Sequence, residues 1–533
     1  MHRCLLVAEI VCLISHQIEN SSLPSFARVC KAFRDPALDV LWSHQDSLGN
    51  LLRCMPEGVW EEAPGVDEDV TWSLTRPVLP SDWERPLLYA RRVKVFIHDA
   101  RTRVMNRPTS SEFMDSLRDC LPCQHLFPNI QTLWFYSHDE WTFRFVRLFL
   151  GPLINSMFLA SPQSMTDLSL LAIIAADCPT LRSLEIVCTD TELDSETAVS
   201  ALIHGLHGLE HIKVPCLNNA ALEHAARLPS LKTLQLRSQT TLDPFRDTFV
   251  SNSTLFPALR TLAISGDNID AVLPLLTLIT NVQVESLAVD LPHELPAKCI
   301  SQLYSAIARY CMKNRTSLKQ LSYGHAPRRP TAIATSAETT AYLLKSPQVL
   351  LLTSFENLVF CTLASPLGFD LDNSTTADLA QAWPHLRELH IVAGAFVNHP
   401  SHVTLEGLLP FAQNCPHLSR LALPLEVSSP PSWPRKIQSS DGKRISQNAL
   451  IVLDVCRSRL DINPLHVAAF LSSVFPRLGW IFTDQEPPPE DPPEDDVEES
   501  TEGLTFHERW KAVAAALPFL RNARAEERIW LRQ

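Results

Sequence analysis

A short pattern, apolar-x-x-apolar-x-apolar, recurs along most of this 533-residue chain and limits its possible folds more than any other feature. The residues between the first two apolar positions are mostly polar, as in Arg182-Ser183 and Lys232-Thr233. Because side chains alternate between the two faces of a strand, the pattern predicts short strands with one buried face. The copies are Ile130/Leu133/Phe135, Leu181/Leu184/Ile186, Leu209/Ile212/Val214, Leu231/Leu234/Leu236, Leu259/Leu262/Ile264, Val284/Leu287/Val289, Leu318/Leu321/Tyr323, Phe355/Leu358/Phe360, Leu386/Leu389/Ile391, Leu418/Leu421/Leu423 and the weaker Leu478/Ile481/Thr483, with Ala90/Val93/Val95 as a degenerate first copy.

A second regularity accompanies the first. Proline ends a helix and can begin a strand without needing a backbone donor. Segments with helical spacing, such as 196–203 and 219–228, follow the strands. Two coincident regularities are not explained by chance, so we expect repeated strand–helix units. Proline stands two positions before the first apolar residue in seven of the eleven full copies, as Pro128, Pro179, Pro229, Pro257, Pro384, Pro416 and Pro476.

This organisation resembles the leucine-rich repeat, in which each unit covers the apolar face of the next. The resemblance implies an α/β fold over residues 86–483, an irregular solenoid or horseshoe of short parallel strands with helical returns. The spacing is uneven, from 22 residues (209 to 231) to 60 residues (418 to 478), so we expect inserted loops. The regular repeat has Asn or Cys eight residues after the first apolar position, whereas this chain has His138, Thr189, Leu217, Gln239, Asp267, Pro292, Ala326, Leu363, Gly394, Glu426 and Glu486.

The first 46 residues predict three short helices. Leu6, Ile10, Leu13 and Ile14 form one apolar stripe at helical spacing. A second helix carries Phe26, Val29, Cys30 and Phe33, and Asp35-Pro36 is a capping signal for a third helix with Leu38, Leu41 and Trp42. Helices this short cannot bury all of that apolar surface among themselves, so some of it should meet the rest of the chain or another protein.

The remaining segments have distinct compositions. Residues 47–85 carry Pro56, Pro64, Pro77 and Pro80 and are interpreted as a linker with short ordered pieces. Residues 484–503 combine prolines with a run of acidic side chains and are expected to be a disordered loop. Residues 504–533 place Phe506, Trp510, Val513, Ala514 and Leu517 at helical spacing, which predicts a helix that caps the array.

Composition and charge exclude several function classes. Glycine is scarce (14 residues), and no nucleotide-binding loop or serine-elbow motif is present. Ten acidic residues between Asp484 and Glu502 supply most of the net charge of −13, so no basic stripe remains for nucleic acid. The 14 cysteines are scattered and indicate reduced thiols in an intracellular protein, cytoplasmic or nuclear. The apolar residues 4–14 resemble a short secretion signal, but Glu9 and the lack of a cleavage site disfavour one, and we expect no membrane partner.

No set of residues indicates catalysis, a cofactor or a metal. His204, His207 and His211 lie close in sequence, but glycines interrupt the helix between them and no H-E-x-x-H arrangement is present. Cys120-x-x-Cys123 with His125 lacks the second pair of ligands that a zinc site needs. The chain is therefore expected not to be an enzyme.

The opening helices resemble the F-box of large fungal protein families. The matching residues are Leu5-Leu6-Val7-Ala8-Glu9-Ile10, Ile14, Ala27-Arg28-Val29-Cys30-Lys31-Ala32-Phe33, Pro36-Ala37-Leu38 and Leu41-Trp42. The resemblance implies docking on a Skp-type adaptor and the cullin subunits of a ubiquitin ligase, while the repeats capture a protein substrate. Val7 and Ala8 stand where the family usually has proline near the glutamate, a departure that predicts weaker docking or a different helix start. The residues expected to face the adaptor, or to form the F-box core, are Leu6, Glu9, Ile10, Ile14, Val29, Cys30, Leu41 and Trp42.

The solvent-facing side of the strands is the expected substrate surface. Trp and Arg are the residue types that most often dominate interface energetics. Two alternatives stay open: a repeat scaffold whose first helices only cap the array, unconnected with ubiquitination, and an enzyme with an unfamiliar α/β layout. Side-chain alternation predicts that the following residues face solvent: Trp134, Glu185, His211, Lys213, Gln235, Glu388, His390 and Arg420.

Overall fold

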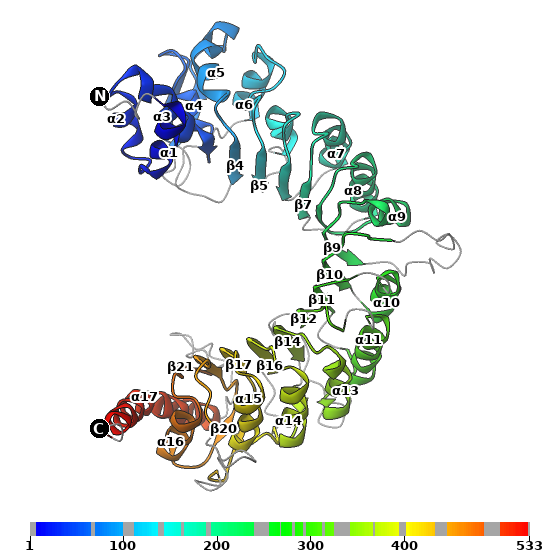
Figure 1. Ribbon diagram of the computed structural model, residues 1–533. Coiled ribbons are helices and arrows are strands. Elements are labelled where there is room, and N and C mark those ends of the chain that lie inside the picture. Colours follow the sequence, from blue (N-terminus) through cyan, green and yellow to red (C-terminus); the bar gives the residue numbers. More distant parts are fainter. Residues whose placement is uncertain are drawn as a thin grey trace. The chain divides into compact units, whose positions relative to one another are not determined.

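The computed structural model divides into two compact units, which are described separately (Figure 1). Unit 1 comprises Met1–Arg237 with Phe256–Ala258, and unit 2 comprises Ser238–Leu255 with Leu259–Gln533. The residues that the structure describes are 7–64, 70–99, 111–136, 143–160, 165–187, 193–238, 255–266, 268–279, 283–291, 295–311, 315–324, 342–365, 368–393, 401–431, 445–483 and 501–530.

Unit 1 contains a parallel sheet whose described strands follow chain order. Each strand pairs with the next without a shift in register from one repeat to another. The helices return on one side of this sheet (Figure 1). The strands are β1 (His44–Gln45), β4 (Val95–Asp99), β5 (Thr132–Tyr136), β6 (Ser156–Ala160), β7 (Ser183–Val187), β8 (His211–Val214) and β9 (Thr233–Ser238). The returns are α6 (Ser111–Asp119), η4 (Phe143–Phe149), α7 (Met165–Asp177), α8 (Leu193–Gly205) and α9 (Asn219–Arg227).

Unit 2 repeats the same plan. Its parallel strands are β10 (Thr261–Gly266), β11 (Ser286–Asp290), β12 (Gln320–Tyr323), β14 (Phe360–Ser365), β16 (Glu388–Ala393), β17 (Arg420–Ala422), β19 (Val452–Asp454) and β21 (Trp480–Phe482). Its helices are α10 (Ile269–Leu278), α11 (Ala297–Tyr310), α13 (Ser346–Leu350), η6 (Leu351–Ser354), α14 (Asn373–Ala382), η7 (Leu405–Leu408), α15 (Leu409–Asn414) and α16 (Pro464–Val474). Two short parallel pairs, β13 (Leu344–Lys345) with β15 (Phe369–Asp370) and β18 (Glu426–Val427) with β20 (Arg459–Leu460), join the returns. The predicted fold of parallel strands with helical returns is confirmed.

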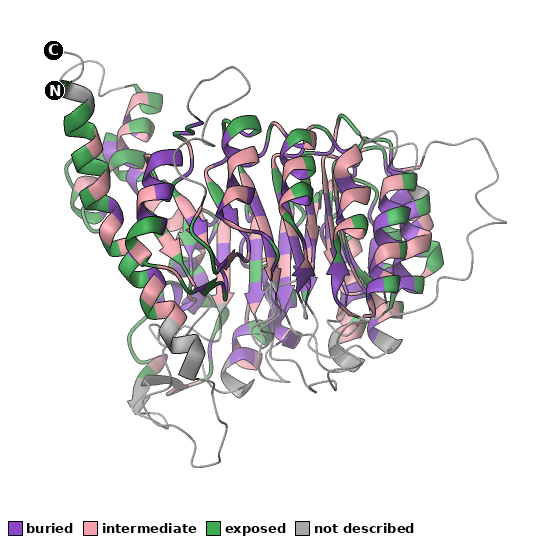
Figure 2. Cartoon of the chain, turned by 90° about the horizontal axis from the view of Figure 1, so that it is seen from below, coloured by how far each residue is buried: buried purple, intermediate pink, exposed green. Residues whose placement is uncertain are grey.

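The apolar pattern works through rows of equivalent side chains. Leu184, Ile212 and Leu234 lie in one register row, and all three are buried. Figure 2 shows buried residues concentrated on the strands and on the helix surfaces that face them. Burying one such side chain stabilises a fold by roughly 1.5–3 kcal/mol, and each row adds its share only when its neighbour is present.

Two of the expected triplets are displaced by three residues. In the first copy, Val93 and Phe96 are the buried positions, whereas Val95 pairs with Thr132 in an outward-facing row. In β14 the buried residues are Cys361 and Leu363 after Leu358, while Phe360 is 39% exposed. Because buried cysteine behaves as an apolar residue, the sequence around β14 fits both the expected triplet Phe355/Leu358/Phe360 and the buried triplet Leu358/Cys361/Leu363.

Two further repeats have the same apolar spacing but were not identified from the sequence. Strand β6 contains Met157 and Leu159 of the triplet Ile154/Met157/Leu159, which has Pro152 two positions before it. Strand β19 contains Leu453, the middle residue of the triplet Leu450/Leu453/Val455. Both triplets are buried, and β19 accounts for the long gap between Leu418 and Leu478.

Polar side chains link successive repeats at the starts of several strands. The residue just before the first apolar position donates a hydrogen bond to a carbonyl of the preceding repeat in several units. Thr180 Oγ1, for example, donates to the carbonyls of Pro152 (2.8 Å) and Ile154 (3.0 Å). Such bonds satisfy carbonyls at the start of each strand, where no ladder partner is available. The other side chains that do so are Asn129, Ser230, Ser317 and Asn357.

The first three helices are α1 (Ala8–Gln17), α2 (Leu23–Ala27) and α3 (Lys31–Ser43). The start expected at Asp35-Pro36 is wrong, because α3 begins at Lys31 and continues through Pro36. Leu23, Ala27 and Ala37 form a small buried core between α2 and α3. This core is closed by Phe26, whose ring stacks on Phe33 at 4.6 Å.

Helix α3 is tied to the rest of unit 1. Arg92 forms ion pairs with Asp35 (2.8 Å) and Asp39, and the Trp42 ring stacks on Tyr89 at 4.7 Å. The chain then continues directly from α3 into β1, the first strand of the unit 1 sheet. The helices therefore stand at one end of the sheet in this unit.

Residues 47–85 carry their own short elements. These are α4 (Gly49–Leu52), the antiparallel pair β2 (Trp60–Pro64) and β3 (Val70–Leu74), η3 (Pro80–Trp83) and the first residues of α5 (Glu84–Ala90). Arg76 holds the buried Asp82 through two hydrogen bonds of 2.8 Å, and the Leu79 N–H donates a third to the same carboxylate. These bonds pin the segment at η3.

The C-terminal helix α17 (Thr501–Trp530) packs against α16 in unit 2. Trp510 is buried and its indole N–H donates to the Ser458 carbonyl at 3.0 Å. The acidic loop expected at 484–503 lies outside the described residues up to position 500. Among the described helices, none is both long and apolar enough to cross a membrane.

Candidate functional site

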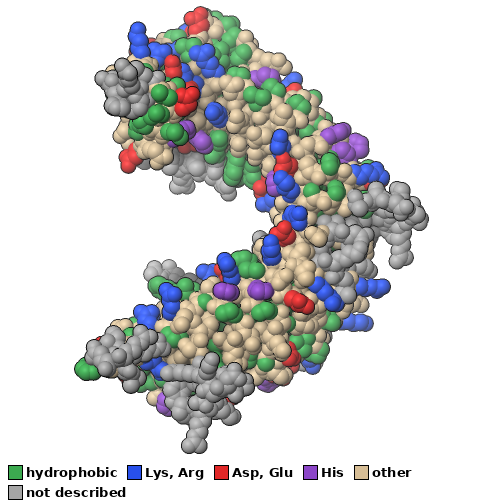
Figure 3. Space-filling view, viewed as in Figure 1, with side chains coloured by type: hydrophobic (Ala, Val, Ile, Leu, Met, Phe, Trp, Pro, Cys, Tyr) green, Lys and Arg blue, Asp and Glu red, His purple; other side chains and the backbone are tan. Residues whose placement is uncertain are grey.

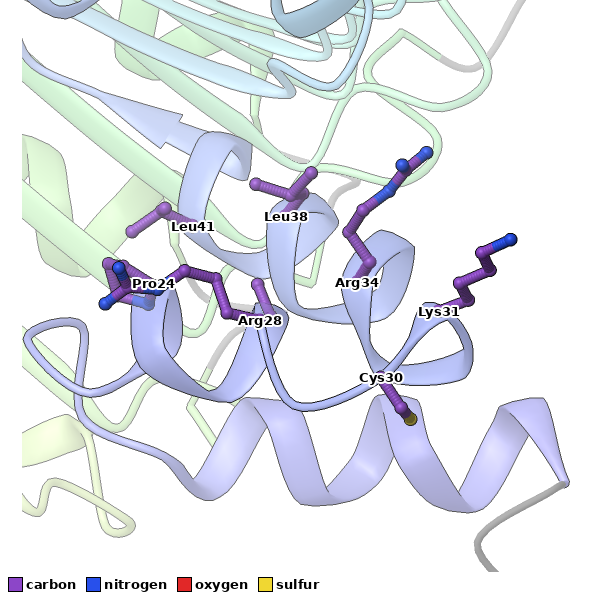
Figure 4. Close-up of a pocket in the computed structure, with 8 residues that line it drawn as sticks. Pro24, Arg28, Cys30, Lys31, Arg34, Leu38 and Leu41 are labelled. Carbon is purple, nitrogen blue, oxygen red and sulfur yellow. The ribbon is translucent and has the colours of Figure 1, made fainter.

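Helices α2 and α3 and the turn between them line an open hollow with a volume of about 720 Å³ (Figure 4). Its apolar lining comes from Leu38 and Leu41 on α3 and from Ala27 and Pro24 on α2. Three cations, Arg28, Lys31 and Arg34, line the same hollow together with Cys30. No carboxylate belongs to this lining, although Asp35 lies 3.7 Å from Arg34 at an exposed position beside it. The hollow therefore combines an apolar surface with positive charge.

Large apolar side chains are exposed around these helices. Val29, in the turn between α2 and α3, is 66% exposed, and Leu13 on α1 is 68% exposed. Val7 is also exposed. Single exposed apolar residues are ordinary, but three on one small helical module leave apolar area without a partner in the described structure.

The residues expected to face an adaptor lie in different environments. Glu9 and Val29 are exposed, and Cys30 and Leu41 line the hollow. Trp42 is engaged with Tyr89 inside unit 1. Leu6 lies outside the described residues, and Ile10 and Ile14 are half-buried on α1, whose fully buried positions are Val11 and Ser15.

The second candidate surface is the solvent-facing side of the unit 1 strands. Trp134, Phe158, Glu185, Lys213 and Gln235 occupy one register row on five successive strands. The Trp134 ring, 41% exposed, stacks on Phe158 at 5.5 Å, while Lys213 and Glu185 form an ion pair of 2.5 Å. The aromatic part and the charged part of the row thus lie side by side.

Neighbouring rows extend this face. Tyr136 packs against Phe158 with ring centroids 4.5 Å apart and adds a third aromatic ring. His211 lies one row away, where its Nδ1 is 3.0 Å from the Thr233 hydroxyl. The structure therefore brings together all five unit 1 residues that the sequence directed outward.

Unit 2 presents a comparable row on β14, β16, β17, β19 and β21. It runs Phe360, Glu388, Arg420, Val452 and Trp480. His390 lies in the next row, with its Nε2 3.6 Å from the Glu388 carboxylate. In Figure 3 cationic, histidine and apolar side chains lie next to one another along the strand side of this unit. The three residues predicted here, Glu388, His390 and Arg420, therefore share one surface.

A similar charged arrangement occurs at the start of the strands in both units. In unit 1, Glu210 accepts hydrogen bonds from Lys232 (2.5 Å) and Arg182 (3.0 Å), which hold the pKa of Glu210 below its ordinary value. In unit 2, Lys319 bonds Glu285 at 2.8 Å and lowers its pKa in the same way, with Arg260 at 3.5 Å. Both carboxylates stay ionised at neutral pH and join three neighbouring repeats.

Three of the described cysteines, Cys178, Cys361 and Cys415, are buried. Burial raises the pKa of Cys178 to about 11 and the pKa of Cys361 and Cys415 to about 12, so these thiols are protonated at neutral pH. In the part of the chain that the structure describes, no three His, Cys, Asp or Glu residues are placed to hold a metal ion. His125 is occupied with the Leu150 carbonyl at 3.0 Å.

Sequence reasoning missed several aromatic residues on the solvent-facing side of the strands, of which Phe158 is half-buried and Phe360, Trp480 and Phe482 are exposed. Phe158 follows the overlooked triplet of β6, and Phe360 was assigned to the buried side by the displaced triplet of β14. Trp480 and Phe482, on the last strand of the unit 2 sheet, are 63% and 52% exposed. Simple alternation around Ile481 would have placed both of these rings outward.

No family model matches the chain, and no curated protein matches it. Among solved structures, it is similar to the crystal structure of the Rad7 and Elc1 complex in yeast, with 14% sequence identity and a TM-score of 0.33. The similarity covers 85% of this chain and 89% of the matched chain. A similarity this low supports no conclusion about function, and the fold assignment rests on the strands and helices described above.

Proposed function

We propose that this protein is a substrate-recognition adaptor of an SCF-type cullin ubiquitin ligase. Helices α1–α3 would dock on a Skp-type adaptor, and the strand faces of the repeats would bind the substrate protein. The proposal assigns the protein to the cytoplasm or the nucleus, and it gives the protein no bond chemistry of its own. Holding a substrate near a ubiquitin-charged enzyme raises the effective concentration of the two reactants.

The observation that carries the proposal is the apolar surface that α1–α3 leave exposed beside a basic hollow. Val29 and Leu13 are about two-thirds exposed, and Leu41 and Leu38 line the hollow between the cations. A docking site typically needs an apolar centre with a polar rim, and this module supplies both. The resemblance of Val29, Leu38 and Leu41 to an F-box supports a Skp-type partner.

A second function has support from the structure as well. The contacts of Arg92 with Asp35 and Asp39, and the stacking of Trp42 on Tyr89, attach α3 to the end of the unit 1 sheet. Repeat arrays need such end caps, so α1–α3 could serve as a cap in a protein-binding scaffold without any ubiquitin ligase. The two functions differ in what happens when the exposed face changes and the attached face does not.

The test is a Leu13→Asp, Val29→Asp double variant of the full chain. Both side chains point to solvent, so the variant should fold as the wild type does, as judged by circular dichroism and thermal unfolding. We expect at least a tenfold loss of binding to a purified Skp-type adaptor in a pull-down titration.

The matched control is Leu465→Asp, which places the same charge on α16, where the side chain is 59% exposed. This control should bind the adaptor as tightly as the wild type. If the double variant also binds at the wild-type level, the docking site is wrong. If the wild-type chain binds no Skp-type adaptor, the scaffold function is favoured.

A further inference from the structure

The C-terminal end of the unit 2 strand face carries two arginines without ionic partners. Arg387, immediately before β16, and Arg420, the first residue of β17, are both exposed, and the backbone N–H of Arg420 donates a hydrogen bond to the Arg387 carbonyl. Within the described residues, neither guanidinium has a hydrogen bond or an ion pair. Every strand-face cation discussed for unit 1 is paired, so these two arginines stand out as available donors.

The nearby carboxylates do not neutralise them. Glu388 shares the register row of Arg420, but its carboxylate lies 3.6 Å from His390. Asp454 lies two residues away from that row on β19, and its carboxylate accepts the Cys456 N–H at 2.8 Å. Among the described residues no ion pair joins either acid to Arg387 or Arg420, and a guanidinium without an ion pair can bind an external carboxylate in a fork geometry.

Exposed apolar side chains follow immediately along the same face. Trp480 and Phe482 on β21 are 63% and 52% exposed, and Ile451 before β19 is 46% exposed. Trp480 shares the register row of Arg420, separated from it by Val452. A cluster of this kind beside a free arginine has the composition of an interaction site, since Trp and Arg dominate interface energetics.

The distance between Arg420 and Trp480 determines how far apart the contacting side chains of a partner must be. Strands β17 and β21 are separated by β19 alone, and neighbouring strands lie about 4.8 Å apart, so Arg420 and Trp480 stem from backbones about 10 Å apart. An extended segment in the polyproline II conformation advances about 3.1 Å per residue with three residues per turn, so residues i and i+3 lie on the same side of it, about 9 Å apart.

We propose that this face, the Arg420–Trp480 row with Arg387, Ile451 and Phe482, binds an extended segment of a partner protein that lies across the strands. The segment carries an acidic side chain for the arginines and a large apolar side chain three residues away for the β21 aromatic rings. This inference rests on the proposed function, because it gives a chemical class to the substrate that the repeats capture.

The test uses the purified full-length chain and fluorescein-labelled decapeptides measured by fluorescence anisotropy at low salt. The probe contains Glu-Ser-Ser-Leu between Gly/Ser flanks. The comparison peptides place Glu and Leu side by side, or replace Glu by Gln. We expect the probe to bind at least five times more tightly than either comparison peptide.

Substitutions on the protein complete the test. Arg420→Glu should weaken binding of the probe at least tenfold and should bind a peptide with Lys in place of Glu more tightly than the probe. Trp480→Ser should also weaken binding of the probe. Phe519→Ser, an aromatic change at a 77% exposed position of α17, should leave the affinity unchanged. Equal binding by Arg420→Glu and wild type, or by the side-by-side peptide and the probe, would overturn the proposal.

Failure of the docking function can be told apart from failure of this inference. The peptide measurement contains no Skp-type adaptor, and the Leu13→Asp, Val29→Asp variant should bind the probe as the wild type does. If the chain binds the probe but no Skp-type adaptor, the peptide-binding row is supported and the ubiquitin-ligase function is refuted. If the chain binds the adaptor but none of the peptides, only the proposed peptide binding by the Arg420–Trp480 row is refuted.

Discussion

Gln447 offers the sharpest test of how neighbouring repeats are joined. Its side chain is buried, and its amide nitrogen donates to the carbonyls of Cys415 (3.1 Å) and Leu418 (2.8 Å) in the preceding repeat. Its amide oxygen accepts the N–H groups of Ala449 (3.1 Å) and Leu450 (2.8 Å) at the start of the β19 repeat. One side chain therefore satisfies backbone groups on both sides of a repeat boundary.

Gln447→Leu keeps the size of this side chain and removes all four hydrogen bonds. The Cys415 carbonyl retains a bond from the Leu418 N–H, so three backbone groups lose their partner: the N–H groups of Ala449 and Leu450 and the Leu418 carbonyl. A buried polar group left unsatisfied costs about 1–3 kcal/mol, so the variant should lose about 3–5 kcal/mol of the free energy of unfolding of unit 2. Leucine's apolar burial offsets only part of this loss.

Urea unfolding combined with hydrogen-exchange mass spectrometry measures the effect, because peptides from β17 to β21 report on unit 2 directly. We expect the midpoint for these peptides to fall and the amide of Leu450 to exchange faster. The matched control is Gln235→Leu, at an exposed position of β9, with an expected change within about 0.5 kcal/mol. If Gln447→Leu unfolds at the same urea concentration as this control, repeat coupling through strand-start side chains is refuted.

Two further predictions concern acid stability and close packing. The Arg76 hydrogen bonds hold the pKa of Asp82 below its ordinary value of 3.8, so this carboxylate stabilises the fold above that pH and the contribution fades as pH falls through the lowered pKa. Asp82→Asn should therefore lower the urea midpoint at pH 7 and shrink the difference between pH 7 and pH 3, and an unchanged pH profile would contradict the role of the pair. A methyl group at Gly407 would lie 2.5 Å from the Asn373 Oδ1 and 2.7 Å from the Val403 Cγ1, so Gly407→Ala should cost about 1–3 kcal/mol in thermal unfolding. At Gly479 the nearest atom would be 3.9 Å away, so Gly479→Ala is the control, and equal melting temperatures for the two variants would refute the packing argument.

The sequence was sufficient for the parallel strands because alternating burial is a local property that each triplet encodes by itself. It was not sufficient for register, which depends on the neighbouring repeat. Val95 and Phe360 are apolar and stand at the expected spacing, yet pairing with Thr132 and Gln320 turns them outward. Cys361 takes the buried position that Phe360 was expected to fill.

The candidate surfaces were predictable only in part for a related reason. Alternation correctly directed Trp134 and Arg420 to the solvent side, but it carries no information about ionic partners across strands. Lys213 is paired with Glu185, whereas Arg420 has no such partner among the described residues. Trp42 shows the same limit in the helices, because its partner Tyr89 is distant in sequence.

The hydroxyl and amide side chains just before the first apolar position of a unit bond carbonyls of the repeat immediately before them, as Thr180, Ser230 and Asn357 do. Their reach is a single step along the array. A complete module, cut at equivalent points in two successive strands that carry such a side chain, could thus be excised or duplicated while the new junction kept a donor and an acceptor. Such modular editing gives a lineage a way to lengthen or shorten its recognition surface without redesigning what remains.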